Sequence, residues 1–205
     1  MVMLRALVAG VLAMAMMIGG ASAADFSGPY IGLMAGYGVE KLNPPAGGGT
    51  AFDWASSGAT GGVFGGYGGV VQGVYLGIEG DVSLRDLTAK AGGGGGFAIE
   101  SGGDWQGTIR ARAGMPWGPA LLYGTVGLAI MDSKTSVAGV GSDSNMLYGL
   151  VVGAGIEAQI TKVMFIRLEA RHVRMPDEDI LIGGTGATIK HDGETTALIG
   201  LGFRF

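Results

Sequence analysis

Gly193-Glu-Thr-Thr-Ala-Leu-Ile-Gly-Leu-Gly-Phe-Arg-Phe205 decides the fold, because its apolar and polar residues alternate up to the last position. Side chains of a β-strand point to opposite faces with a period of two residues. One face of this stretch therefore carries Ala197, Ile199, Leu201, Phe203 and Phe205. The other face carries Thr196, Leu198, Gly200, Gly202 and Arg204. The alternation predicts a strand with one apolar face and one face of small or polar residues.

The first 23 residues predict a cleaved secretory signal peptide. A basic residue, Arg5, precedes an apolar run from about Ala6 to Ile18, and small residues ending in Ala21-Ser-Ala23 follow. A charged start, an apolar centre and an Ala-x-Ala site are the parts of such a signal. A membrane-spanning helix needs about 20 apolar residues, and this run is shorter. We therefore expect a signal peptide at residues 1–23 and a single domain at residues 24–205.

The composition excludes several classes of protein. The chain has no cysteine, so a disulfide framework, a thiolate nucleophile and a cysteine-bound zinc site are all impossible. The formal net charge of −4 argues against nucleic acid as a partner. The mean hydropathy of +0.41 is high for a chain with 43 glycines, yet no long apolar run follows the signal. Hydrophobicity that is spread over every second residue is typical of membrane strands, not of a membrane helix.

Seven further alternating segments precede the closing stretch. With that stretch they give eight predicted strands, at residues 29–40, 59–68, 74–85, 105–115, 120–131, 147–159, 164–174 and 193–205. The predicted connections alternate in length. Four are long and polar or glycine-rich, at residues 41–58, 86–104, 132–146 and 175–192, whereas those at 69–73, at 116–119 and near Thr161 are short. Pro116 and Pro119 predict a tight turn across the whole of residues 116–119.

Eight charged residues lie in mid-strand positions, and all of them fall on the face opposite the aliphatic residues. They are Glu79, Asp81, Arg110, Arg112, Glu157, Arg167, Glu169 and Arg171. A soluble two-sheet sandwich shows the same alternation with the charges facing water, so the pattern alone does not say which face is wet. Four acids against four arginines could pair across a narrow interior. The aliphatic faces also match the 9–11 residues of a membrane crossing, and Tyr37, Trp105 and Tyr148 lie near strand ends, as interfacial aromatic residues do.

We therefore predict an all-β fold, an eight-stranded antiparallel up-and-down transmembrane β-barrel. The interior of such a barrel is only wide enough to be filled by side chains. Arginines paired with carboxylates would fill it, so we expect a plugged barrel without a large pore. An even number of strands with alternating short and long connections places both mature termini on the periplasmic side.

The motifs resemble one known family in their order along the chain. They are Gly28-Pro-Tyr-Ile-Gly32, Gly62-Val-Phe-Gly-Gly-Tyr67, Leu76-Gly-Ile-Glu-Gly-Asp81, Gly107-Thr-Ile-Arg-Ala-Arg112, Leu122-Tyr-Gly-Thr125, Gly153-Ala-Gly-Ile-Glu157, Ile166-Arg-Leu-Glu-Ala-Arg171 and Gly200-Leu-Gly-Phe-Arg-Phe205. The series resembles the small outer-membrane β-barrels of Gram-negative bacteria, namely OmpA-type transmembrane domains and short porin-family proteins. The chain departs from that family in its glycine-rich second strand, in the five-glycine run Gly92 to Gly96, and in the outward position of His172.

The resemblance implies a location in the cell outer membrane and a mainly structural, surface-contact or small-solute role. It also implies assembly by the barrel-insertion machinery, which reads the terminal strand, here through Ile199, Leu201, Phe203 and Phe205. It brings no catalytic residue and no cofactor. The expected partners are outer-membrane lipid and lipopolysaccharide, and a monomer is expected. The alternatives are a narrow porin-like diffusion channel for small solutes and a soluble secreted ligand binder.

Three local motifs match known kinds of site only in part. Gly153-Ala-Gly-Ile-Glu-Ala158 matches a dinucleotide fingerprint, but the sequence keeps alternating where that fingerprint needs a helix. His172 lies near the outer end of its strand, as in barrels that cut lipid acyl chains, yet the residues two positions away are Ala170 and Arg174, not serine. The acidic run at residues 177–179 is typical of a solvated loop, so no metal is predicted.

Overall fold

A computed structural model of the chain describes residues 25–43, 54–86, 89–93, 97–102, 105–137, 141–174, 178–182 and 185–205. The predicted signal peptide, residues 1–23, lies outside these ranges and stays a prediction. Within the described ranges, no helix is both long and apolar enough to cross a membrane. Eight long strands form the wall of the molecule. They are β1 (Gly28–Asn43), β2 (Trp54–Val71), β3 (Val74–Asp86), β6 (Trp105–Trp117), β7 (Ala120–Val137), β8 (Gly141–Gln159), β9 (Met164–Arg174) and β11 (Thr185–Arg204).

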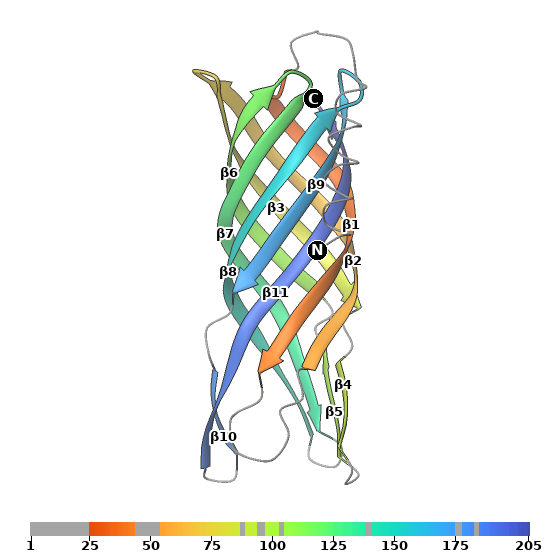
Figure 1. The fold of residues 1–205 in the computed structure, drawn as a ribbon, viewed down its shortest axis with the longest axis vertical. Helices are drawn as coiled ribbons and strands as arrows, with labels where there is room; N and C mark the ends of the chain where they lie inside the picture. The colour runs from red at the N-terminus through yellow and green to blue at the C-terminus, as the bar shows by residue number, and fades with distance from the viewer. Residues whose placement is uncertain are drawn as a thin grey trace.

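The eight strands close into a barrel, as the sequence predicts. Each strand pairs antiparallel with its neighbours in the order β1-β2-β3-β6-β7-β8-β9-β11. The closing stretch then returns to β1, where Leu201 lies opposite Leu33 and Phe203 lies opposite Ile31. Figure 1 shows the strands inclined around a tall cylinder, with the chain's C-terminus at the end that carries the short turns.

The short connections are tight hairpin turns. Gln72 and Gly73 join β2 to β3 with positive φ angles of 52° and 84°, the backbone of a type I′ turn, which matches the twist of the strands it joins. Between β8 and β9, the Thr161 hydroxyl accepts a hydrogen bond from the backbone N–H of Met164 at 3.0 Å. All three short connections lie at one end of the barrel, the turn end. The opposite end, where the longer hairpins extend, is the hairpin end.

The predicted turn at residues 116–119 is too long, because β6 continues through Pro116 and Trp117. Trp117 pairs with Ala120, so only Gly118 and Pro119 form the turn. In a two-residue hairpin the pair next to the turn is hydrogen-bonded, which leaves the Pro116–Leu121 pair non-hydrogen-bonded. The nitrogen of Pro116 therefore points away from β7. The pairing of β6 with β3 ends at Gly114, so no bond is lost on that side either.

The four predicted long loops also contain more strand than expected. β7 and β8 stay paired up to Val137 and Gly141, and β11 begins at Thr185. Three short strands extend the hairpin end: β4 (Ala89–Gly93), β5 (Phe97–Gly102) and β10 (Glu178–Ile182). The alternation of residue types ends before the backbone pairing does. The alternation of residue types is needed only where one face of a strand is apolar and the other is enclosed. A hairpin that extends beyond this part of the wall can form backbone pairs without alternating residue types.

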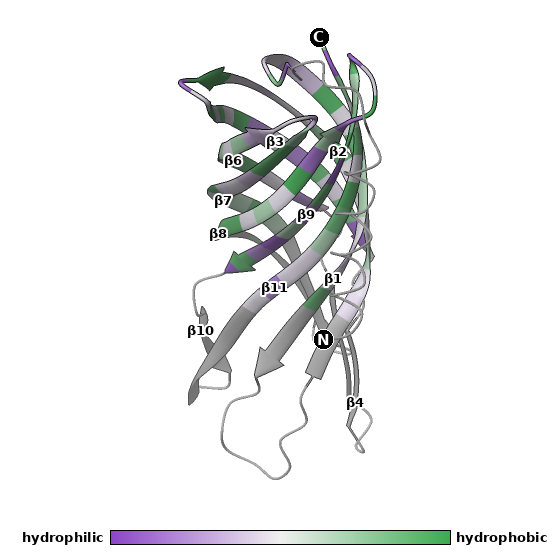
Figure 2. Cartoon of the chain, turned by 45° about the horizontal axis from the view of Figure 1, so that its top comes forward, coloured by the Kyte–Doolittle hydropathy of each residue, from purple (hydrophilic) through white to green (hydrophobic). Residues whose placement is uncertain are grey.

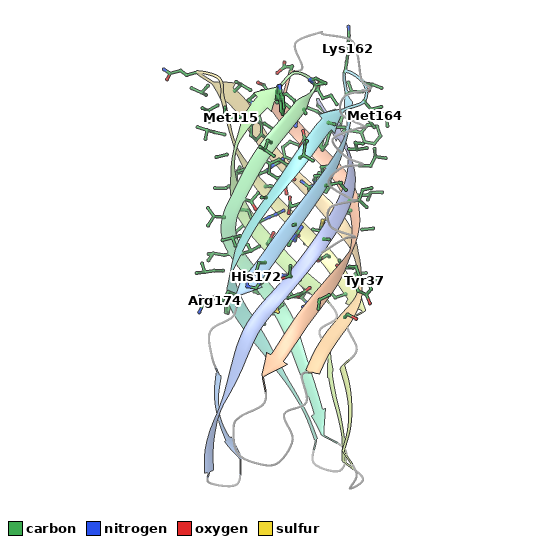
Figure 3. All side chains as sticks on the ribbon, in the orientation of Figure 1. Tyr37, Met115, Lys162, Met164, His172 and Arg174 are labelled. Atoms are coloured by element: carbon green, nitrogen blue, oxygen red, sulfur yellow. The ribbon has the colours of Figure 1, made fainter. Side chains whose placement is uncertain are left out.

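The apolar face of every wall strand points outward. Leu33, Leu128 and Leu150 are about 60% exposed (65%, 60% and 59%), whereas the inward Leu198 is 5% exposed. Figure 2 shows hydrophobic and hydrophilic residues alternating along the strands, and Figure 3 shows one set of side chains projecting from the wall and the other filling the interior. The inside of the molecule is thus its polar side, and the outside is its apolar side.

Candidate functional site: the charged interior

The structure brings the eight charged mid-strand residues together inside the barrel. None of them is more than 5% exposed. β3 supplies Glu79 and Asp81, and β6 supplies Arg110 and Arg112, because alternate residues of a strand share a face. β8 supplies Glu157, and β9 supplies Arg167, Glu169 and Arg171 in the same way.

Glu79 lies at the centre of this network. Its carboxylate accepts from Arg110 at 2.5 Å, from Arg112 at 3.0 Å and from Arg167 at 2.6 Å. The hydroxyl of Tyr30 donates to it as well, at 2.9 Å. Glu79 and Arg110 are direct cross-strand neighbours, whereas Arg167 reaches across from the far wall on β9. One carboxylate on β3 therefore links its own strand to β1, β6 and β9 through charge-assisted hydrogen bonds.

Asp81 and Glu169 extend the network toward the hairpin end. Asp81 accepts from Arg110 at 2.9 Å and from Arg171 at 3.0 Å, and the Thr108 hydroxyl also donates to it. Glu169 pairs with Arg110 and lies 3.4 Å from Arg171 Nε. Arg110 thus bridges three carboxylates, and its planar guanidinium has the donors needed to do so.

Glu157 extends the network toward the turn end, where it binds an arginine that we did not predict as part of the network. It pairs with Arg112 at 3.1 Å and with Arg204 at 2.6 Å. Arg204 is 5% exposed and lies on the inward face of the closing stretch, as its place in the alternation indicates. The alternation therefore indicated that Arg204 faces inward. Its place next to the last residue did not suggest that it belongs to the charged network.

Aromatic rings pack against the buried guanidinium groups. The Arg112 guanidinium carbon lies 3.9 Å from the centre of the Tyr123 ring, and that of Arg167 lies 3.5 Å from the centre of the Phe64 ring. A cation over a ring face is attracted to the electrons of the ring, and the attraction is stronger where water is excluded. Tyr123 also donates a hydrogen bond to Glu169 at 2.9 Å. The rings thus fill the space between the ion pairs and fix their positions.

A separate buried ion pair lies in the interior near the hairpin end. Arg85 of β3 pairs with Glu194 of β11, and the two side chains are 5% and 2% exposed. A small apolar cluster lies on the walls nearby, made of Ala129, Met131, Val151 and Val173. Arg85 Nη1 lies 3.7 Å from Met131 Sδ. This pair was not among the predicted site residues, although both members fall on inward positions of their strands.

The segment before β1 closes the turn end. Phe26 is fully buried and packs with Tyr75, Leu121 and Tyr123, which lie on β3 and β7. These strands do not border β1, so the segment crosses the mouth of the barrel to reach them. The backbone oxygen of Asp25 accepts a hydrogen bond from Gln159 at 2.6 Å. Phe26 lies before the first alternating segment, so the pattern of the sequence does not predict this contact.

The other predicted positions lie on the outer surface. Ile199, Leu201, Phe203 and Phe205 are 40% to 78% exposed and face outward, and their reading by the insertion machinery stays a prediction. His172 also faces outward. Its Nδ1 lies 3.0 Å from the hydroxyl of Thr195, which lies on the neighbouring strand β11. Positions two residues away along the sequence do not include this partner, because His172 and Thr195 are far apart in the chain. The side chains of His191 and of residues 177–179 lie outside the part of the chain that the structure describes.

The pairing of the interior side chains determines what chemistry the interior can support. Each carboxylate of the network is paired with at least two guanidinium groups, and the described residues hold no cluster of His, Asp or Glu that could bind a metal ion. Five arginines face four acids, because Arg204 adds to the four predicted arginines. The site is a set of buried cross-links between strands, and each cross-link depends on its partners being present.

The chain belongs to the family of outer membrane protein beta-barrel domains, whose pattern it matches over residues 6–205. It is 29% identical over 182 residues to the 25 kDa outer-membrane immunogenic protein of Brucella canis, a match that covers 88% of this chain and 80% of that protein. It is 36% identical over 115 residues to the 22 kDa outer membrane protein of Rhizobium leguminosarum bv. viciae, a match that spans 54% of each protein. The protein is therefore an outer-membrane β-barrel.

A solved structure has the same fold at low sequence identity. Neisserial surface protein A (NspA) superposes with a TM-score of 0.54 at 13% identity, covering 87% of this chain and 98% of that one. The likeness concerns the fold alone. It agrees with the closed eight-stranded wall.

Proposed function

We propose that this protein is a sealed outer-membrane barrel with a structural and surface-interaction role. The observation that carries the proposal is the interior network, in which Glu79, Asp81, Glu157 and Glu169 are each bound by at least two arginines and buried on all sides. Side chains held by several charge-assisted hydrogen bonds have little freedom to move aside for a solute. The same pairing engages all four network carboxylates with guanidinium groups, so none of the four is free to act as a general base, which supports a role that is not enzymatic.

We further propose that both mature termini face the periplasm. The described start of the chain and its last residue lie together at the turn end, where Phe205 N–H donates to Pro29 O at 2.9 Å. At the hairpin end, by contrast, β7, β8 and β11 run well past the end of β9, as Figure 1 shows. Outer-membrane barrels of this kind have short periplasmic turns and longer extracellular connections, so the hairpin end is the one that contacts the surroundings of the cell.

The partners follow from this placement. The outward aliphatic band contacts the hydrocarbon of the outer membrane, and its hairpin-end boundary contacts lipopolysaccharide. The outward residues of the closing stretch bind the barrel-insertion machinery during assembly. We propose a monomer, because the eight strands satisfy one another in a closed ring without an open edge across the wall.

Recordings from planar lipid bilayers test the sealed interior. The purified full-length barrel should insert without stable single-channel steps. The variant Glu79→Ala, which removes the central carboxylate, should give small steps or increased current noise if it inserts. Stable, uniform single-channel steps of the unaltered protein would overturn the sealed barrel and favour a narrow diffusion channel for small solutes. A change in gel mobility on boiling serves as the control that the inserted protein is a folded barrel.

A further inference from the structure

Arg174 differs from every other arginine that the structure describes. Seven arginines lie in the described ranges, and six of them point into the interior. Arg174, the last residue of β9, is exposed on the outward face. An arginine facing hydrocarbon is costly at the membrane midplane but nearly free at the boundary with the headgroups. Its position therefore marks that boundary, and a phosphate is the partner that a guanidinium binds best there.

The outward-facing residues of β9 change from apolar to polar toward Arg174. From the turn end it runs through Ile166, Leu168 and Ala170, and then reaches His172 and Arg174. Figure 3 shows His172, Arg174 and Tyr37 on the hairpin-end side of the wall and Lys162 at the turn end. The two polar side chains thus follow the apolar residues on the same outward row, toward the hairpin end.

His172 is held in a fixed orientation by β11. Its Nδ1 lies 3.0 Å from Thr195 Oγ1, its direct cross-strand neighbour. Its Nε2 lies over Gly193, where a Cβ would come within 3.0 Å of that nitrogen. When the Thr195 hydroxyl donates to Nδ1, the ring proton is on Nε2, so this nitrogen is a donor. Gly193 is closer to the hairpin end than Thr195, so the donor is directed toward the side of Arg174.

The pair lies between the β11 backbone on one side and exposed aliphatic side chains of β8 on the other. Gly193 has no side chain and a positive φ of 84°, and the pairing of β11 with β9 ends beside it, at Glu194 and Val173. Gly193 is buried, so the ring of His172 packs against the β11 backbone at this point. On the β8 side, Leu150 and Val152 lie opposite Arg174 and His172 and are 59% and 50% exposed. An acyl chain along these aliphatic side chains would bring its headgroup to the two donors.

We propose that Arg174 and His172 Nε2 bind a phosphate group of lipopolysaccharide, with Thr195 as the residue that positions the histidine. The choice of lipid rests on the proposed function, since that places the hairpin end in the outer leaflet. Lipopolysaccharide carries its phosphates at the boundary between acyl chains and sugar, the depth at which the two side chains lie. Among the side chains that the structure describes, no carboxylate forms an ion pair with Arg174.

Native mass spectrometry of the full-length barrel, titrated with diphosphoryl lipid A in detergent, tests the site. Arg174→Gln should weaken binding about tenfold, the loss expected for one charge-assisted hydrogen bond. His172→Gln should weaken it less, and Thr195→Val should reproduce part of that loss. Lys162→Gln, which removes a cation at the opposite end, is the matched control and should bind as the unaltered protein does.

Further measurements test whether the phosphate is the group recognised and whether it belongs to lipopolysaccharide or to a phospholipid. Lipid A without phosphates should bind the unaltered protein and Arg174→Gln equally, and equal binding of the diphosphoryl form to both would overturn the site. If Arg174→Gln weakens phosphatidylglycerol but not lipid A, the commitment to lipopolysaccharide is wrong. Labelling of a cysteine placed at Gln72 on intact cells reports the orientation separately, so a barrel with reversed orientation is distinguished from a barrel without a phosphate site.

Discussion

Glu79 shows how much a single side chain can decide in this interior. Three guanidinium groups and one phenol converge on its carboxylate, and all of them are buried. A buried network of this kind does not by itself make a protein stable, because removing charges from water is costly. The network instead makes each member dependent on the others, so that the loss of one partner leaves several buried charges uncompensated.

We expect Glu79→Gln to lower the free energy of unfolding by about 3–5 kcal/mol, because Arg110, Arg112 and Arg167 all lose their shared counter-charge. Urea unfolding of the barrel refolded in lipid vesicles measures the change. Asp25→Asn serves as the control, since that carboxylate is exposed, and it should change stability by less than about 0.5 kcal/mol. Equal loss in both variants would contradict the central place of Glu79.

Phe26 is a second residue on which we expect stability to depend, although it lies before the first strand. We expect Phe26→Ala to destabilise the barrel by about 3 kcal/mol, because the ring is fully buried against Tyr75 and Tyr123. Phe26→Leu keeps an apolar side chain of similar size and should cost less than about 1.5 kcal/mol. The same unfolding measurement applies, and a stable Phe26→Ala variant would show that the segment does not close the turn end.

At the scale of the strands, glycine and aromatic residues are complementary across the wall. Aromatic rings lie over glycines of the neighbouring strand, where a Cβ would collide with the ring; the pairs are Phe64 over Gly32, Tyr30 over Gly66, Tyr123 over Gly155 and Phe165 over Gly202. Each of the four glycines faces inward. The many glycines of this chain therefore make room for the rings that surround the arginines.

A pair of glycine substitutions separates this effect from a general need for flexibility. Gly202→Ala should cost about 1–3 kcal/mol, because its Cβ would enter the ring of Phe165 and force overpacking. Gly124 faces outward, and a Cβ there would meet only Gly153 O at 3.8 Å. Gly124→Ala should thus be neutral or slightly stabilising. If both variants lose stability to the same extent, the rings do not explain the glycines.

At the scale of the whole molecule, the sequence predicted the eight strands and the two faces of each. It could do so because a barrel wall imposes one rule on every strand, apolar outside and small or polar inside. The rule identifies β9 to the residue, Met164 to Arg174, because there the alternation and the backbone pairing end together. It also places Arg204 and Glu194 on the inward side. It does not say which charges meet, because that depends on the stagger between strands around the ring.

The remaining differences have physical causes of the same kind. The contact of Phe26 lies before the first strand, where no period applies. The hairpin extensions of β7 and β8 pair without an apolar face, so the alternation does not mark their ends. Pro116 stays within β6 because its nitrogen lies on the side where β3 has already ended. Each of these features depends on a neighbouring strand and not on the local sequence.

The measurement that tests the central claim most directly is the depth profile of the outward face of β7. The chain has no cysteine, so single cysteines carrying a nitroxide can be placed at Leu122, Gly124, Val126 and Leu128 without a background signal. In lipid vesicles, collision with oxygen should exceed collision with a water-soluble nickel complex at all four sites and be greatest near Val126. A strong collision rate with the nickel complex along the whole strand would mean that water covers the apolar face, and it would contradict the membrane barrel.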